Sequence, residues 1–195
     1  MPYLLQRLIA ALAFVALSPL VLMTAVAVRV FSGSPILYVA DRVGHRKARF
    51  PQYKFRTMVP DADKLIEGDL GTVEINRVTK VGAVLRSTSL DELPQLVNVF
   101  MGDMALVGPR PLHPSVAERV DDNHVRFSVL PGITGLAQVS GRNTIAWSKR
   151  LEFDARYVKS RSLVNDLRIL AKTISRVTRR SDIVLDRNTS DVLDI

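Results

Sequence analysis

Hydrophobic residues dominate the start of the chain. The run from position 8 to position 28 carries no charge, and Arg7 and Arg29 bound it. At ~1.5 Å per helical residue, a run of this length matches a hydrocarbon layer of ~30 Å. Ser18-Pro19 interrupts the run near its middle, where proline removes a backbone donor and kinks a helix. The pattern therefore predicts a membrane helix that breaks at Ser18 and Pro19.

Four interpretations of this segment compete. A cleaved signal peptide is disfavoured because the run is long and a small-residue cleavage site is missing. A buried core helix is disfavoured because such helices are rarely apolar on all sides over this length. A kinked single span and a re-entrant helix hairpin both remain. Basic residues after the run place the downstream chain in the cytoplasm, and Arg7 on that same side would fit the hairpin.

A β-hairpin is predicted next. Ile36–Val39 is typical of a short strand, Gly44-His45-Arg46-Lys47 of a turn, and Phe50–Met58 of a returning strand. Alternation along the second strand places Gln52, Lys54 and Arg56 on one face. The two cations indicate either a solvated strand face or a pair directed at a phosphate.

The remaining pattern is mainly helical. Asp91–Met101 is predicted to be a helix that ends at Gly102, and Met104–Val107 a short buried strand. Residues 59–82 are polar and predict a short helix and a surface excursion. Loops rich in glycine and proline follow at 108–111 and 131–135, helices at 146–160 and 163–178, and a polar tail from 181.

The last predicted helix is amphipathic. Its apolar residues recur at intervals of four and three, at Leu163, Leu167, Leu170, Ile174 and Val177. Its cations stand away from that stripe, at Arg168, Lys172, Arg176 and Arg179. Such a helix suits an anionic membrane surface. It would equally suit a helix that packs on the core with a solvated basic face, so both interpretations stay open.

Composition narrows the chemistry. The chain has 195 residues, no cysteine and three histidines without metal-ligand spacing, which excludes disulfides and makes a zinc site improbable. Its formal charge is +8. Residues 142–180 hold eleven Lys/Arg against three Asp/Glu, so the whole excess lies there. Nucleic-acid binding is not predicted, because no aromatic residues interleave with this basic stretch.

Two adjacent carboxylates are the candidate catalytic residues. Asp91 and Glu92 precede an apolar run, so they could simply cap a helix, with Pro94 tolerated in its first turn. Alternatively, an ionised and exposed Asp91 could attack phosphorus, and Glu92 could help to hold Mg²⁺. Attack on a diphosphate also needs cations near the transferred and leaving groups. The candidate substrate-binding cations are Lys54, Arg56, Arg86, Arg110 and Arg142.

Several stretches together resemble a known family, the bacterial sugar transferases, which are monotopic polyprenyl-phosphate phosphoglycosyl transferases. They are Leu-Ser-Pro-Leu at 17–20, Tyr-Lys-Phe-Arg-Thr-Met at 53–58, Leu-Arg-Ser-Thr-Ser-Leu-Asp-Glu-Leu-Pro-Gln-Leu at 85–96, Gly-Asp-Met-Ala-Leu-Val-Gly-Pro-Arg-Pro at 102–111, the segment 131–143, and Asp166-Leu167 with Lys172-Thr173. The resemblance runs from about residue 5 to 180. One departure is the stretch 74–80, where the family often has Asp-Pro-Arg-Ile-Thr.

The resemblance implies an enzyme on the cytoplasmic face of the bacterial inner membrane. It would move a sugar phosphate from a UDP-sugar to polyprenyl (undecaprenyl) phosphate, release UMP, and so initiate a membrane glycan such as an exopolysaccharide. Asp91 would match the nucleophile of a ping-pong scheme, with Glu92 and Mg²⁺ beside it. Lys54, Arg86, Arg110 and Arg142 would match phosphate-binding or uridine-diphosphate-binding positions. The Ser18-Pro19 break would favour the re-entrant hairpin.

These inferences combine into one expected organisation. We expect an α+β, mainly helical fold with a re-entrant membrane helix at 1–31, a cytoplasmic catalytic domain at 32–180 and a polar tail at 181–195. Because longer relatives carry further N-terminal membrane helices and another domain, the chain is expected to be a minimal version. The rival hypothesis is a membrane-anchored, non-enzymatic protein whose basic helices bind anionic lipid. The acidic pair separates the two, since an anchor does not need it.

Overall fold

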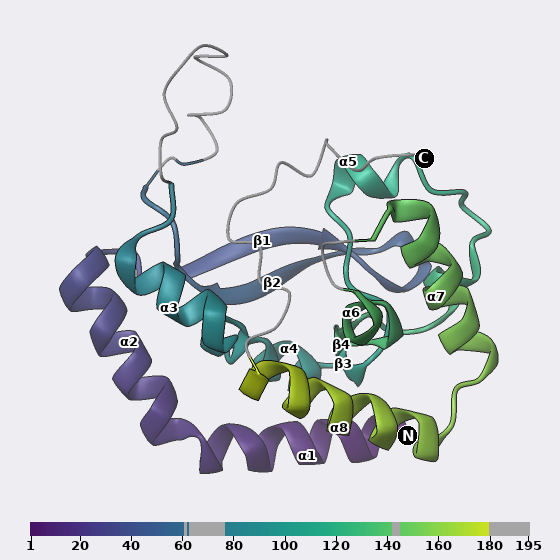
Figure 1. Cartoon of the computed structure of the whole chain (residues 1–195), viewed down its shortest axis with the longest axis horizontal. Coiled ribbons are helices and arrows are strands. Elements are labelled where there is room, and N and C mark those ends of the chain that lie inside the picture. Colours follow the sequence, from purple (N-terminus) through teal and green to yellow (C-terminus); the bar gives the residue numbers. More distant parts are fainter. Residues whose placement is uncertain (61, 63–76, 142–144, 180–195) are drawn as a thin grey trace.

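A computed structural model of the chain describes residues 1–60, 62, 77–141 and 145–179. These residues form a mainly helical structure, as predicted, with the predicted hairpin and a second small sheet that was not predicted (Figure 1). The longer helices are α1 (Tyr3–Ala16), α2 (Ser18–Ser32), α3 (Lys80–Thr88), α7 (Trp147–Lys159) and α8 (Leu163–Arg179), and the shorter ones are α4 (Gln95–Met101), α5 (Pro114–Ala117) and α6 (Leu136–Ser140). The predicted excursion falls largely, and the predicted tail wholly, outside the described residues.

The N-terminal segment is a bent pair of helices. The axes of α1 and α2 differ by 63° across Leu17, and the Ser18 hydroxyl donates to the carbonyl of Val15 at 2.8 Å. The predicted break at Ser18-Pro19 is therefore confirmed. Among the described helices, none alone has the length and hydropathy to cross a membrane, whereas this pair meets that criterion together.

One face of α1 packs against the rest of the molecule. Ala10 is fully buried beside Leu96, Val99 and Met104 of the neighbouring elements. Gln6 is also buried, and its side-chain oxygen accepts from the backbone amide of Leu106 at 2.8 Å. Helix α1 therefore packs against the segment 96–106 through both apolar contacts and a buried hydrogen bond.

The β-hairpin forms the first sheet. β1 (Leu37–Val43) and β2 (Arg49–Phe55) are antiparallel, joined by the 3₁₀ turn η1 (His45–Lys47). The first strand is longer than predicted. The second strand ends at Phe55 rather than Met58, so Arg56 lies beyond the pairing with β1.

The predicted helix 91–101 is wrong in its first half. A 3₁₀ turn, η3 (Leu90–Glu92), precedes α4, which begins only at Gln95 and ends, as predicted, at Gly102 with a left-handed φ of 97°. Pro94 lacks the amide that an α-helix would bond to Leu90, so this stretch follows the tighter turn. Helix α3, before it, has no counterpart in the predicted elements.

A second, parallel sheet pairs β3 (Ala105–Val107) with β4 (Gly132–Thr134). The strand β3 is as predicted, but the predicted loop 131–135 contains β4. The backbones approach very closely here, since a Cβ on Gly132 would lie 2.1 Å from the amide nitrogen of Gly108. Only glycine fits such a contact, and it sets the loop 108–111 directly on β4.

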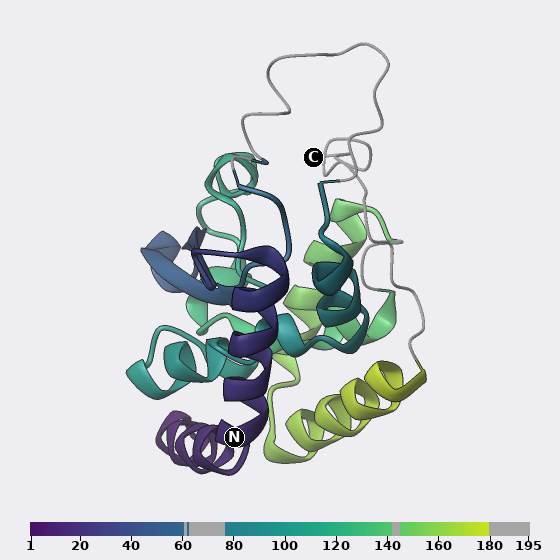
Figure 2. The same cartoon turned by 90° about the vertical axis from the view of Figure 1, so that its left-hand side faces the viewer.

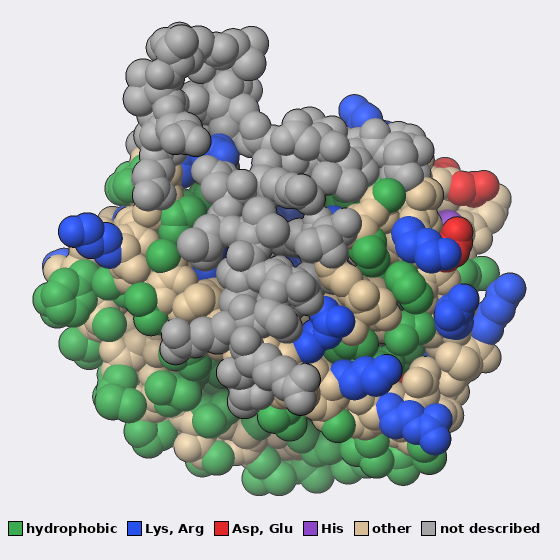
Figure 3. Space-filling view, viewed as in Figure 1, with side chains coloured by type: hydrophobic (Ala, Val, Ile, Leu, Met, Phe, Trp, Pro, Cys, Tyr) green, Lys and Arg blue, Asp and Glu red, His purple; other side chains and the backbone are tan. Residues whose placement is uncertain are grey.

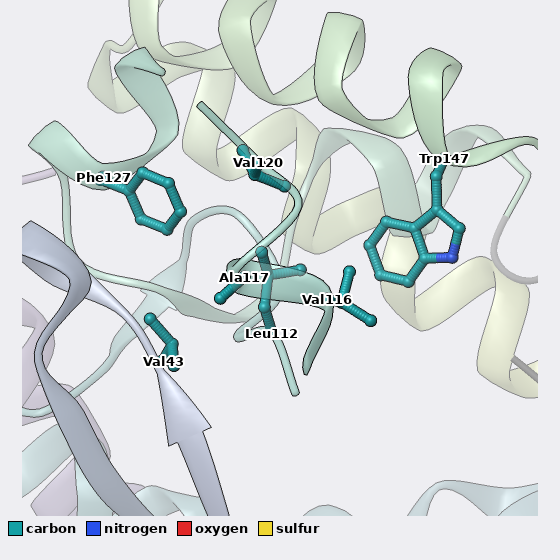
Figure 4. Packing of buried hydrophobic residues seen from close by; sticks show 7 residues of the cluster. All are labelled: Val43, Leu112, Val116, Ala117, Val120, Phe127 and Trp147. Atoms are coloured by element: carbon teal, nitrogen blue, oxygen red, sulfur yellow. The ribbon is translucent and has the colours of Figure 1, made fainter. Parts of the chain in front are cut away.

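A hydrophobic cluster holds the far end of the hairpin. Figure 4 shows Phe127 of η4 (Val125–Ser128) facing Val43 of β1, with Trp147 at the start of α7 on the other side of α5. The buried members are Val43, Leu112, Val116, Ala117, Val120, Phe127 and Trp147. The cluster joins β1, α5, η4 and α7 on one side of the loop 108–111.

Candidate active site

The acidic pair lies in the short turn between α3 and α4. Ser89 ends α3 in the left-handed region with φ 58°, which is uncommon for a residue with a side chain. The amides of Glu92 and Leu93 then donate three residues back, to Ser89 and Leu90. This turn sets Asp91 and Glu92 between two helices, close to the end of β2.

Glu92 is held by two cations. Its Oε1 accepts from Lys54 Nζ of β2 and from Arg110 Nη2 of the loop 108–111, both at 2.9 Å. Burial alone would raise the pKa of Glu92, but the two cations outweigh it and hold that pKa well below its usual range. Burial lowers the pKa of Lys54, and Glu92 raises that of Arg110. Glu92 is therefore ionised throughout the neutral range.

Asp91 has a different environment from its neighbour. The residue is only 9% exposed, and in the described part of the chain no side chain donates a hydrogen bond to its carboxylate. Burial, reinforced by the charge of Glu92, raises the pKa of Asp91 to about 6, against the opposing effect of nearby cations. The expectations that Asp91 is exposed and that it caps a helix are both wrong, since Ser89 and Pro94 occupy the cap positions.

Arg86 is the third cation at the site. It lies in the last turn of α3, and its Nε donates to the Thr57 hydroxyl at 2.9 Å. Its charge lowers the pKa of Asp91 alongside the charges of Lys54 and Arg110. The fold thus brings together five of the predicted site residues, Asp91, Glu92, Lys54, Arg86 and Arg110.

Two other predicted cations are not placed with them. The Arg56 guanidinium is buried and donates to the backbone carbonyls of Ser32 and Ser34, where α2 leads into the hairpin. It joins the N-terminal segment to the end of β2, and no described contact links it to the acidic pair. Arg142 lies outside the described residues.

Buried amides that the sequence analysis missed bind β2 to α4. Asn98 Nδ2 donates to the carbonyl of Pro51 at 2.6 Å, and Asn98 Oδ1 accepts from the amide of Tyr53 at 3.0 Å. Gln95 accepts from Gln52 at 3.1 Å. These bonds fix the strand that carries Lys54 against the helix that follows Glu92. Gln95 and Asn98 stand three residues apart in a predicted helix, and this spacing was the available signal.

The site contains two carboxylates that could hold a divalent cation. The described residues include no group of three acidic or histidine ligands. Mg²⁺ usually takes one or two carboxylates and completes its shell with substrate phosphates and water. Asp91 and one oxygen of Glu92 would fit that pattern, because both described donors to Glu92 engage its other oxygen.

A largely apolar face lies along α1 and α8. Figure 2 shows these helices along the same lower edge, with α2 rising from α1, and Figure 3 shows hydrophobic side chains gathered there. In α8, Asp166 and Ile169 are buried, whereas Leu163 and Leu167 are about half exposed. Leu163, Leu167 and Ile174 of the apolar stripe therefore face outward, whereas Leu170 of the same stripe packs against the core beside Ile169. The exposed large side chains of this face are Leu4, Leu5, Leu8, Ile9, Leu12 and Val15 of α1 and Leu163, Val164, Leu167 and Ile174 of α8.

Comparisons with known proteins place the sequence among sugar transferases. The family model of bacterial sugar transferases matches residues 2–180. The uncharacterized sugar transferase EpsL of Bacillus subtilis is 44% identical over 161 residues, which cover 82% of this chain and 78% of that protein. The exopolysaccharide production protein ExoY of Sinorhizobium fredii is 41% identical over 186 residues, which cover 87% of this chain and 82% of that protein. The undecaprenyl-phosphate galactose phosphotransferase of Salmonella typhimurium is 44% identical over 163 residues, covering 76% of this chain but 34% of that protein.

Proposed function

The chain belongs to the bacterial sugar transferase family, and from this premise we propose that it transfers a sugar 1-phosphate from a UDP-sugar to polyprenyl phosphate. Family membership makes the chain a transferase and removes the non-enzymatic anchor as an alternative. The observation that carries the proposal is the contrast at the site, where the Asp91 carboxylate accepts no hydrogen bond from a described side chain while Glu92 is fixed by Lys54 and Arg110. One carboxylate is thereby available for reaction.

The proposed chemistry has two displacement steps. In the first, an Asp91 oxygen attacks the phosphorus that bears the sugar, the bond from that phosphorus to the bridging oxygen breaks, and UMP leaves with that oxygen. In the second, a phosphate oxygen of the lipid attacks the same phosphorus and releases Asp91. The product is a polyprenyl diphosphate sugar. A pKa of about 6 keeps Asp91 mostly ionised at neutral pH, as a nucleophile requires.

The cations around the pair would serve the phosphates. The Arg110 side chain is 47% exposed, so its guanidinium can meet a substrate oxygen while it stays bonded to Glu92. Arg86, in the last turn of α3, acts electrostatically on Asp91 as well. Negative charge that develops on the transferred phosphoryl group and on UMP would thus face preorganised positive charge. When bound at Asp91 and Glu92, Mg²⁺ would supply further charge neutralisation.

We also propose that α1 and α2 form a re-entrant membrane hairpin. Support comes from both ends of the pair, which contact the same globular body. The Tyr3 hydroxyl accepts from the amide of Leu130 at 3.2 Å, and the Ser32 hydroxyl bonds Thr79 at 3.2 Å. A spanning segment would carry its two ends to opposite sides of the bilayer. The exposed apolar residues of α1, α2 and α8 would enter the cytoplasmic leaflet of the inner membrane.

Relatives suggest the substrates. One carries the name undecaprenyl-phosphate galactose phosphotransferase, and another, from Klebsiella pneumoniae, UDP-glucose:undecaprenyl-phosphate glucose-1-phosphate transferase. The chain spans 34% and 38% of their lengths. We propose undecaprenyl phosphate as the acceptor, a UDP-hexose as the donor, and the first step of exopolysaccharide assembly as the cellular role.

The test supplies the purified protein with Mg²⁺, undecaprenyl phosphate and a panel of UDP-sugars, and measures UMP. We expect UMP with at least one donor, and a radiolabelled sugar phosphate retained on the protein when the lipid is omitted. Asp91→Asn should lose both signals. Asp41→Asn is the matched control, because Asp41 is an exposed partner of Arg49 on the hairpin. The absence of UMP with every donor would refute the proposal.

A further inference from the structure

The backbone of the loop that carries Arg110 is held by a second arginine. Arg126 of η4 is 5% exposed, and its Nη2 donates to the backbone carbonyl of Arg110. The guanidinium of Arg110 then reaches Glu92 at 2.9 Å. Arg126 therefore contacts the residue that holds Glu92, while its own side chain stays away from the acidic pair.

Arg126 is in turn paired with an acid of the neighbouring helix α7. Its Nη1 lies 3.0 Å from Asp154 Oδ2 of α7, and both side chains are only 4% exposed. The contact with Asp154 is an ion pair, whereas the bond from Nη2 to the Arg110 carbonyl is a hydrogen bond, and the rigid guanidinium plane couples the two positions. The result is a continuous path from α7 through η4 and the loop 108–111 to the turn η3.

Stability alone is a weak explanation for this buried pair. Removing two charges from water costs about as much as their attraction returns, and well-packed apolar residues in their place are often neutral or stabilising. A buried arginine that donates to one loop carbonyl and pairs with one acid does, however, specify a single position for that loop. Catalysis depends strongly on such placement, because a shift of about 1 Å can cost about 100-fold in rate.

We propose that Arg126, anchored by Asp154, is a positioning residue that fixes Arg110 against Glu92 for the reaction at Asp91. The inference rests on the proposed function for its catalytic consequence. Its structural claim is separate: without Arg126, the Arg110 side chain leaves Glu92 and becomes more accessible. That claim can be measured without any substrate.

The experiment compares the parent protein with Arg126→Leu/Asp154→Leu, which exchanges the buried pair for apolar side chains. Thermal unfolding reports stability, UMP release gives kcat and KM for the donor, and peptide mass spectrometry gives the rate at which phenylglyoxal modifies Arg110. We expect an unchanged or higher unfolding temperature, a fall in kcat/KM of about 100-fold, and severalfold faster modification of Arg110. Arg49→Met is the control, because it breaks an exposed ion pair, to Asp41 on the hairpin, and should leave kcat/KM and the Arg110 rate unchanged.

Two further variants make the outcome decisive. Arg126→Lys keeps a positive charge for Asp154 but loses the planar guanidinium, so it should also speed modification of Arg110. This variant tests the inference if the double variant fails to fold. In an Arg110→Ala background, Arg126→Lys should change kcat/KM by less than about twofold, because positioning acts only through Arg110. Parental kcat/KM and a parental Arg110 rate in either folded variant would overturn the inference. A parent that releases no UMP would instead refute the proposed function, and the Arg110 rates would still decide the structural claim.

Discussion

Two clusters of oppositely charged side chains differ in their exposure to solvent. At the site, Glu92 joins Lys54 and Arg110, whose side chains are 15% and 47% exposed. In the domain interior, Arg126 joins Asp154, and both are 4% exposed. The first cluster is open, so its cations can also meet a phosphate. The second is closed and can only hold its surroundings in place.

The contrast shows that one kind of ion pair can serve two purposes. An open pair beside a carboxylate with a raised pKa can provide reactive and binding groups, as proposed for this site. A sealed pair provides geometry, and its energetic contribution appears mainly when one partner is removed. Substitutions at the site should therefore lower activity with little effect on stability, whereas removal of one partner of the closed pair should lower both.

The largest expected effect comes from Asp91. Asp91→Asn should lower UMP release by roughly 10⁴-fold or more, as loss of a covalent nucleophile does in other enzymes. Asp154→Asn, the same exchange in the closed cluster, should leave measurable turnover. UMP release by both variants, at matched amounts of folded protein, would check this, and equal losses would abolish the proposed distinction between the clusters.

Breaking the closed pair from one side should lower the stability of the protein in addition to releasing Arg110. Arg126→Met leaves Asp154 buried and unpaired, so we expect a loss of roughly 3–5 kcal/mol in the free energy of unfolding. Arg49→Met, which removes an exposed partner of Asp41, should cost less than about 1 kcal/mol. Denaturant unfolding in the same detergent would compare the two. A similar small loss for both would show that the Arg126 pair is not sealed.

Glu92 should affect rate more than stability. Glu92→Gln removes the charge that gathers Lys54 and Arg110, so both cations lose their common acceptor. We expect kcat/KM to fall about 10–1,000-fold, a range typical for loss of an electrostatic contact at an active site. A steady-state assay with varied UDP-sugar would measure it. Parental kinetics would mean that the two cations hold their positions without Glu92.

The smallest expected effect is a shift in pH dependence. Asp91 must be ionised to attack, so UMP release should decline as pH falls through about 6. The charge of Glu92 raises the pKa of Asp91 and that of Lys54 lowers it. The acid limb should therefore move to lower pH in Glu92→Gln and to higher pH in Lys54→Met. Profiles of kcat/KM at constant Mg²⁺ would show the two directions, and shifts of the same sign would contradict this arrangement of charges.

The sequence predicted the local elements with uneven success. The break at Ser18-Pro19, the β-hairpin, β3, α7 and α8 all follow from periodicity and from proline or glycine within a few residues. Helix α3 was missed because its nine residues, Lys80–Thr88, lack a long apolar stripe. The turn η3 was predicted as helix because Pro94 is tolerated in a first turn, yet here the helix begins after it.

Among the candidate site residues, residue type was easier to predict than environment. The sequence identified the acidic pair and the cations that the fold brings to it, but it placed Arg56 with them and gave Arg126 no role. Both arginines are buried and bonded to carbonyls from distant segments. Such partners leave no periodic trace near the residue in the chain.

The sequence by itself determined the broken apolar segment, the concentration of positive charge after residue 141, and the adjacent carboxylates of the family motif. Each depends on residues that are neighbours along the chain. Only the tertiary structure decided that Glu92 is paired while Asp91 accepts no side-chain hydrogen bond within the described ranges, because the two cations at Glu92 come from 38 residues before it and 18 after it. A carboxylate's pKa depends on burial and on charges within a few ångströms, and folding alone sets both.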